Sequence, residues 1–113
     1  MPAAYQNLYL EQGATFSTTI TIDDVYGEVF DLTGFTAKSQ VRKSYYSTNP
    51  TATFSTTINI TNGTITLDLD SANTANIPAG RYVYDTIIND PSSNTVTRIL
   101  EGIIDVSPRV TRL

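Results

Sequence analysis

The chain has 113 residues, a length that suits one domain with one hydrophobic core and is too short for two. Only 16% of the residues are charged, the net charge is −4 and the basic residues are scattered, so electrostatic binding of nucleic acid is not expected. Cysteine and histidine are absent, which excludes disulfides, thiolate metal sites and the commonest general base.

The first regular pattern along the chain is an alternation of apolar and hydroxyl side chains over residues 14–22, which predicts a half-buried strand. The same nine-residue sequence returns at 52–60 with one difference, Thr21 against Asn59. An internal duplication would place the two segments at equivalent positions of the fold. Chance similarity between two strands built from few residue types is the favoured explanation, because the flanking residues do not continue the match.

The middle of the chain carries turn signals between further alternating segments. A turn is expected at 23–28 and a strand over 35–43, followed by an exposed loop at 44–51. Asn62-Gly63 separates two alternating segments and predicts a hairpin closed by a two-residue type I′ turn, in which both residues adopt positive φ.

The last third begins with a break in the alternation before Pro78. The spacing of apolar residues predicts one short helical turn at 71–77, capped by Asp70 or Ser71. Gly80 and Tyr82 then have the spacing of the tyrosine corner of immunoglobulin-like domains, in which a strand tyrosine bonds back to the preceding turn. The alternative is that Tyr82 and Tyr84 are ordinary aromatic residues on one strand face.

Two long strands close the chain. They are expected at 81–88 and 95–106, with a turn at 90–94, and Gly102 indicates a bulge or bend in the second. About seven strands with turn signals every eight to twelve residues predict an all-β fold, an immunoglobulin-like antiparallel β-sandwich of residues 1–113. The end segments, 1–6 and 107–113, are possible docking arms.

Acidic residues are the first candidates for chemistry. They group in one loop and at the end of one strand: Asp23, Asp24, Glu28, Asp31, Asp68 and Asp70. A calcium site requires six to eight converging oxygens, and no spaced calcium-binding loop is present, so solvated turns are the favoured interpretation. Serine nucleophiles lack a histidine partner, and no phosphate-binding glycine loop occurs. We expect no enzyme activity, no cofactor and no metal.

Aromatic and basic residues in loops and end segments are the candidates for interaction. They are Tyr5, Tyr9, Tyr45, Tyr46, Arg109 and Arg112. Tyrosine and arginine are enriched where subunits meet, and exposed tyrosine rings can also stack on sugars. The pair Tyr45 and Tyr46, in the expected loop, is the first choice for a binding surface.

Four sequence blocks in order resemble a family of small domains in tailed-phage virion proteins, similar to the N-terminal domain of phage baseplate upper proteins. The blocks are Leu8–Phe16, Phe30–Ala37, Ile77–Asp85, and Thr97–Gly102 with Val106–Pro108. The resemblance implies an immunoglobulin-like sandwich that functions by assembly, in the tail or baseplate or as a neck or capsid decoration.

That resemblance also sets the expected partners and location. The partners would be other virion proteins and symmetry copies of the chain, without nucleic acid or membrane, and the location would be the virion. No signal peptide is visible at the N-terminus. The alternative is a carbohydrate-binding or adhesin-type β-sandwich module that uses the loop tyrosines.

Overall fold

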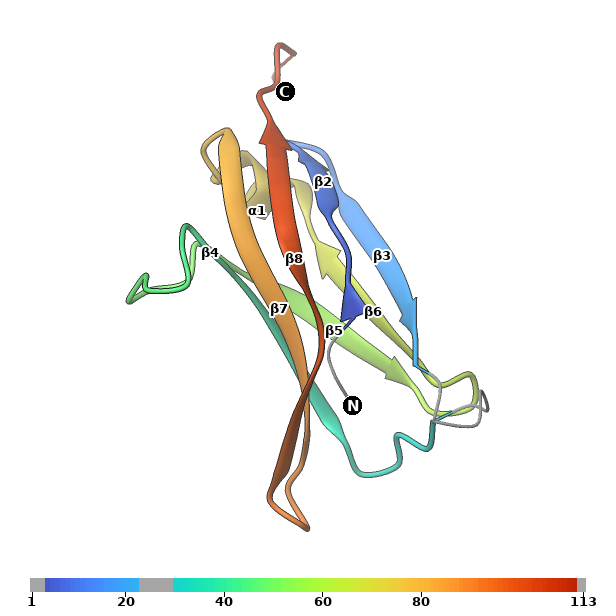
Figure 1. Ribbon diagram of the computed structural model, residues 1–113. Coiled ribbons are helices and arrows are strands. Elements are labelled where there is room, and N and C mark those ends of the chain that lie inside the picture. Colours follow the sequence, from blue (N-terminus) through green and yellow to red (C-terminus); the bar gives the residue numbers. More distant parts are fainter. Residues whose placement is uncertain (1–3, 23–29, 112–113) are drawn as a thin grey trace.

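The computed structural model describes residues 4–22 and 30–111. Within these ranges the chain forms eight strands and one short helix (Figure 1). In chain order they are β1 (Ala4–Tyr5), β2 (Leu8–Glu11), β3 (Phe16–Thr21), β4 (Thr36–Arg42), β5 (Ala52–Asn59), β6 (Thr64–Leu69), α1 (Ser71–Ala75), β7 (Gly80–Asp90) and β8 (Thr95–Ser107).

The strands form two layers that face each other across the core. One layer contains β1 and β2 beside β8, then β7 and β4, and the other contains β3, β6 and β5 (Figure 1). Strand β5 joins both, because Ala52–Phe54 pair with β4 whereas Ser55–Asn59 pair with β6. This order is that of an immunoglobulin-like sandwich, so the all-β fold class expected from the sequence is confirmed.

The two similar nine-residue segments lie on opposite sides of β6. Ser17 of β3 and Ser55 of β5 both pair with Asp68, and Ile20 and Ile58 both pair with Ile65. The exposed positions of both strands carry polar residues, and the inward positions carry apolar residues together with Thr18 and Thr56. This equivalence is what an internal duplication predicts, although the shared environment also favours the same residue types.

Aromatic rings connect the two layers at the centre of the core. The ring of Phe54 lies 5.8 Å from Phe16 of β3 and 6.4 Å from Tyr84 of β7. Tyr84 occupies the strand position at which antibody domains carry a core cysteine. Packing of this aromatic chain therefore links the sheets where antibody domains use a disulfide.

The corner before β7 forms as the sequence predicts. Helix α1 is capped by Asp70, whose Oδ1 accepts a hydrogen bond of 2.8 Å from the Asn73 N–H. The Tyr82 hydroxyl donates a hydrogen bond of 2.6 Å to the Pro78 carbonyl, which is the tyrosine corner. Tyr82 and Tyr84 are also both buried on one strand face, so the two interpretations of this segment hold together.

Gly80 serves the corner through its backbone. Its φ is +145°, a conformation that side-chain-bearing residues rarely adopt, and a Cβ added there would meet only the Lys43 Nζ, at 3.4 Å. Gly80 is exposed, so tight packing does not require a glycine here. A glycine is needed because any other residue would be strained at this φ.

The predicted hairpin at Asn62-Gly63 exists, but the predicted type I′ turn is wrong. Asn59 pairs with Thr64, which leaves four connecting residues, and of Asn62 and Gly63 only Gly63 has a positive φ, +64°. The Asn59 side chain accepts a hydrogen bond of 3.2 Å from the Asn62 N–H and stabilises the wider turn.

The predicted bulge at Gly102 is also wrong. The register of β7 and β8 shifts between Thr86 and Ile87, so the extra residue is Ile99, and the bulge turns both Ile99 and Leu100 toward the core. Gly102 has a different role, because a Cβ there would overlap the Gln6 carbonyl oxygen. The glycine leaves room for the Gln6 carbonyl as the N-terminal segment runs beside β8.

At the N-terminal edge, the expectation of an all-antiparallel scaffold is wrong. The sequence pattern did not predict strands β1 and β2, and both pair with β8 in parallel. The two strands share one register with β8, since Ala4 lies opposite Leu100 and Leu8 lies opposite Ile104. The Gln6 N–H donates to the Glu101 carbonyl at 2.9 Å, so residues 4–6 belong to the sheet.

Candidate functional site

Three exposed tyrosines lie on one surface, which we call the tyrosine face: the solvent side of β1, β2, β8, β7 and β4. Tyr9 alternates with buried Leu8 and Leu10. Tyr5 pairs with Glu101 and Tyr9 pairs with Asp105, and both acidic side chains also point outward. The exposed fraction is 59% for Tyr5 and 70% for Tyr9. Large exposed aromatic residues grouped on one face are typical of an interaction surface.

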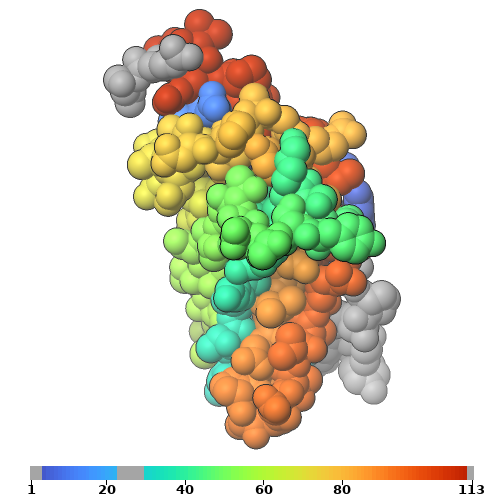
Figure 2. Space-filling model, turned by 90° about the vertical axis from the view of Figure 1, so that its left-hand side faces the viewer, coloured from blue at the N-terminus to red at the C-terminus, as the bar shows by residue number. Residues whose placement is uncertain are grey.

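The third tyrosine reaches this face from the loop at 43–51. The loop stands out from the body in Figure 1, and in Figure 2 it lies in green at the front, near the middle of the body. Tyr45 lines a pocket with Val83 on β7, whereas Tyr46 beside it is 96% exposed and is not among the residues that line that pocket. The two adjacent tyrosines predicted as a binding surface are therefore separated: only Tyr45 borders a concave site.

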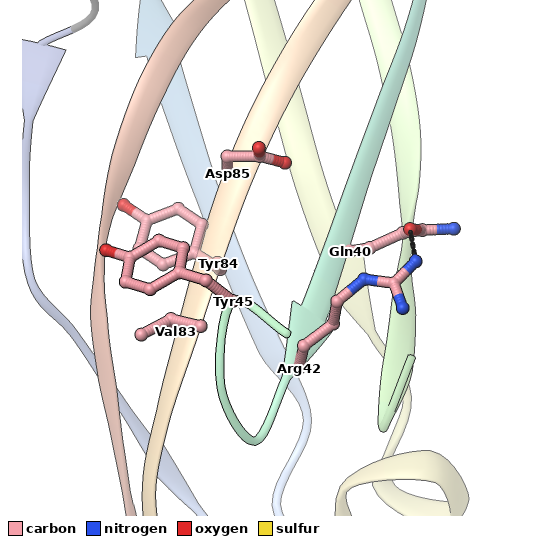
Figure 3. Close-up of a pocket in the computed structure, with 6 residues that line it drawn as sticks. All are labelled: Gln40, Arg42, Tyr45, Val83, Tyr84 and Asp85. Atoms are coloured by element: carbon pink, nitrogen blue, oxygen red, sulfur yellow. Dashed lines mark hydrogen bonds between the residues drawn. The ribbon is translucent and has the colours of Figure 1, made fainter. Parts of the chain in front are cut away.

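The pocket under Tyr45 has a volume of about 130 Å³ and is lined by Gln40, Arg42, Tyr45, Val83, Tyr84 and Asp85. In Figure 3, Tyr45 and Val83 lie on one side and Gln40 and Arg42 on the other, with Asp85 at the upper end. Gln40 pairs with Asp85 and Arg42 with Val83, so neighbouring strands place these four side chains on the same face.

The described end segment at the C-terminus packs on its own domain. The Arg109 side chain lies across Gly13, whose φ of +84° and missing Cβ leave room for it. The Gln12 side chain accepts a hydrogen bond of 3.3 Å from the Arg109 N–H and donates one of 2.9 Å to the Ile77 carbonyl. Arg109 is thus half-buried, and Arg112 lies outside the described residues.

The opposite surface of the sandwich differs in chemistry. The outward residues of β3, β6 and β5 align in three rows, and we call this surface the hydroxyl face: Ser17, Asp68 and Ser55; Thr19, Thr66 and Thr57; Thr21, Thr64 and Asn59. It carries no aromatic side chain among these positions. Aromatic anchors therefore distinguish the tyrosine face from the hydroxyl face.

Two ion pairs lie on the tyrosine face. Arg81 contacts Asp105 at 3.0 Å and Arg98 contacts Glu101 at 3.2 Å, and both pairs are solvent-exposed, so they contribute little stability. The Lys43 Nζ lies 4.8 Å from the centre of the Tyr82 ring and bonds to the Arg81 carbonyl, so this cation points toward the corner.

Two hydroxyls and two carboxyls have perturbed acidity for identifiable reasons. Burial raises the pKa of Tyr82, and burial together with the charge of Tyr5 raises the pKa of Tyr84 to about 12. Hydrogen bonds from Thr33 and from Ser92 lower the pKa values of Asp31 and Asp90. These hydrogen bonds are local turn contacts, so none of the four groups forms a catalytic arrangement with another.

The acidic candidates are dispersed where the structure describes them. Asp31 bonds to the Thr33 N–H, Asp68 lies on the hydroxyl face and Asp70 caps α1. Over residues 4–22 and 30–111, no group of three or more acidic side chains is arranged to hold a metal ion. Asp23, Asp24 and Glu28, with the turn expected there, lie outside the described residues.

The sequence prediction missed most of the pocket. Gln40, Arg42, Val83 and Asp85 were not among the predicted site residues, although alternation on 35–43 does place Gln40 and Arg42 on one strand face. That signal is local, whereas Val83 and Asp85 are contributed by a strand about forty residues later, which no local pattern reveals.

Fold and site together define an immunoglobulin-like β-sandwich whose exposed aromatic residues gather on one sheet. The chain belongs to the LtfC-like β-sandwich domain family, whose model matches residues 2–107. No curated protein matches the sequence. Among solved structures, InlP of Listeria monocytogenes is similar, with a TM-score of 0.53 and 16% identity over 93% of this chain.

That structural likeness concerns the fold alone. The chain spans 28% of the length of the InlP structure, so it corresponds to one part of a larger protein. In the part of the chain that is described, no helix is both long enough and apolar enough to cross a membrane.

Proposed function

We propose that this chain is a non-catalytic structural domain of a tailed-phage virion. It is held in the tail or baseplate region, or as a neck or capsid decoration, by contacts with other virion proteins and with copies of itself. The four sequence blocks that resemble phage virion domains support this origin, and membership of the LtfC-like family is compatible with it.

The observation that carries the assembly role is the position of Tyr5 and Tyr9. Both rings are more than half exposed on an edge strand that is itself hydrogen-bonded into the sheet. A rigid strand that displays large aromatic side chains binds a partner with little loss of conformational freedom. We place the main protein contact at this edge of the tyrosine face.

The end segments act in this proposal as supports for the contact. The described residue Arg109 packs on Gln12 and Gly13, directly after β2, so the C-terminal segment steadies the strand that carries Tyr9. With a net charge of −4 and no basic cluster, nucleic acid is not among the proposed partners.

Mass spectrometry of purified virions tests the virion assignment, and its failure to detect the chain would refute it. The contact surface is tested separately with a photo-crosslinking amino acid at position 9 during assembly. We expect crosslinks to a neighbouring subunit from position 9 and none from position 57, which lies on the hydroxyl face. Equal crosslinking from both positions would contradict the proposed surface.

A further inference from the structure

The loop that carries Tyr45 is fixed by one arginine. The Arg42 Nη1 donates to the carbonyls of Ser47 at 2.9 Å and Thr48 at 3.1 Å, and its Nη2 donates to the Gln40 Oε1 at 2.9 Å. Inside the loop, the Ser44 N–H donates to the Ser47 Oγ at 3.1 Å. These bonds restrict the loop backbone on both sides of Tyr45, so the loop presents Tyr45 beside the pocket.

The pocket keeps hydrogen-bonding groups of both kinds unused. A guanidinium has five N–H donors, and three are engaged, so Arg42 retains Nε–H and one Nη2–H. The Gln40 amide uses its oxygen for Arg42, and its NH2 group has no partner among the described residues. The carboxylate of Asp85 likewise makes no hydrogen bond or ion pair with the part of the chain that is described.

The charges at the pocket balance. One guanidinium and one carboxylate line it, and the neighbouring Glu101 is paired with Arg98. Lys43, the next cation along the chain, points to the Tyr82 ring instead. An anionic ligand would approach Asp85 without a surplus of positive charge, and a metal ion would find one carboxylate only, so a neutral ligand suits the site better.

From this geometry we propose that the pocket under Tyr45 binds one ring of a neutral saccharide. The adjacent hydroxyls of a sugar both donate and accept hydrogen bonds. They can donate to the Asp85 carboxylate and accept from the N–H groups of Gln40 and Arg42. The apolar face of the sugar packs on the Tyr45 ring and on Val83. The inference goes beyond the assembly role and does not depend on it, because it concerns a different part of the tyrosine face.

The size of the site sets the expected affinity. A volume of about 130 Å³ is below the usual range for pockets that enclose drug-sized ligands, so the site accommodates a single ring that stays partly in solvent. A ligand with about a dozen heavy atoms and partial burial binds with a dissociation constant on the order of 1–10 mM. Repetition of the domain in an assembly would raise the apparent affinity.

Nuclear magnetic resonance titration of the full chain tests the proposal. The probes are the methyl glycosides of glucose, galactose and mannose and N-acetylglucosamine, each added up to about 50 mM, with galacturonate as the anionic comparison. We expect at least one neutral probe to shift the backbone signals of Gln40, Arg42, Val83 and Asp85 in a saturable manner. Galacturonate should bind more weakly than methyl galactoside.

Two adjacent residues provide a matched pair of variants. Tyr45→Ala should weaken binding roughly tenfold by removing the stacking surface, whereas Tyr46→Ala should leave it within about twofold. Asp85→Asn, which keeps the shape of the side chain, should weaken binding and leave the spectrum of the free protein dispersed. Signal dispersion in every variant shows that the fold is intact.

Three results would overturn the proposal. They are absence of shifts for all neutral probes, shifts confined to residues outside the pocket, and equal affinity of Tyr45→Ala and the unsubstituted chain. If the sugars fail and Tyr45→Ala instead abolishes the subunit crosslinks from position 9, the pocket is a protein contact, and the saccharide inference falls while the assembly role stands.

Discussion

The hydroxyl of Tyr84 donates a hydrogen bond of 2.6 Å to the carbonyl oxygen of Gln6, a residue 78 positions earlier in the chain. Tyr84 is 3% exposed, so this bond provides a partner for its buried hydroxyl and fastens the N-terminal strand to the core. Gly102 makes the contact possible, because any side chain there would occupy the space of the Gln6 carbonyl.

Tyr84→Phe removes only the hydroxyl and leaves the Gln6 carbonyl without its partner. We expect the free energy of unfolding to fall by about 0.5–1.5 kcal/mol, since the variant loses one hydrogen bond between the core and the N-terminal strand. Urea denaturation measures this loss. Tyr9→Phe, whose ring is 70% exposed, is the control and should change stability very little.

The same hydroxyl makes stability depend on pH in the alkaline range. Burial, followed by the charge of Tyr5, raises the pKa of Tyr84 from 10.0 to about 12. The folded state therefore retains a proton that the unfolded state releases, so stability is unaffected below about pH 10 and decreases between about pH 10 and pH 12. Burial also raises the pKa of Tyr82, which adds to the decrease.

Denaturation midpoints at about pH 9 and about pH 11 measure this effect. Tyr84→Phe should lose less stability between these two values than the unsubstituted chain, because it lacks one of the two titrating hydroxyls. A steeper decrease in Tyr84→Phe than in the unsubstituted chain would contradict the assignment.

Gly102→Ala forces the N-terminal strand away from β8. A Cβ at this position would lie 2.0 Å from the Gln6 carbonyl oxygen, so the backbone of Gln6 must shift. We expect the free energy of unfolding to fall by about 1–3 kcal/mol. The Gln6 N–H, which in the unsubstituted chain bonds to the Glu101 carbonyl, should exchange its hydrogen faster.

The control for that substitution is Gly34→Ala. Gly34 has a φ of +82° but no heavy atom within 4 Å of the added Cβ, so alanine there causes backbone strain alone. It should lower stability without changing the exchange rate at Gln6. Equal exchange at Gln6 in both variants would show that Gly102 is not needed for the N-terminal segment to lie beside β8.

Ser39 and Thr86 form a buried hydroxyl pair between β4 and β7. The Ser39 Oγ donates to the Asp85 carbonyl at 2.8 Å and lies 3.0 Å from the Thr86 Oγ1, and both residues are almost fully buried. Ser39→Ala should destabilise more, because it leaves the buried Thr86 hydroxyl without its partner, whereas in Thr86→Val the Ser39 hydroxyl still donates to the Asp85 carbonyl.

The double variant should lose less stability than the sum of the single variants, with a coupling of about 0.5–3 kcal/mol. Removing both hydroxyls leaves an apolar contact in place of an unsatisfied group. A double-mutant cycle, with stabilities from urea denaturation, measures the coupling free energy between the two hydroxyls. Strict additivity would mean that the two hydroxyls do not interact.

Several features of the molecule could be predicted from the sequence because their causes are local. Alternation over 14–22, the cap at Asp70 and the spacing of Gly80 and Tyr82 each depend on a few consecutive residues. The turn at Asn62-Gly63 was located correctly, yet its type was wrong, since the Asn59 side chain stabilises a longer connection.

The candidate site was predictable only in part. Exposure of Tyr5, Tyr9, Tyr45 and Tyr46 is as expected for terminal and loop residues. Nothing local distinguishes Tyr45 from Tyr46, however, because the difference arises from Arg42 holding the loop over Val83 and Asp85. The predicted interaction of these tyrosines stays a prediction.

The sequence by itself determined an all-β sandwich and the place of its turns and corner, because side-chain period and turn chemistry act over short stretches of chain. Only the tertiary structure decided the parallel pairing of the N-terminal strand with β8, the need for glycine at 102 and the pocket under Tyr45. Each of these depends on residues far apart in sequence, for which no periodicity specifies which segments meet.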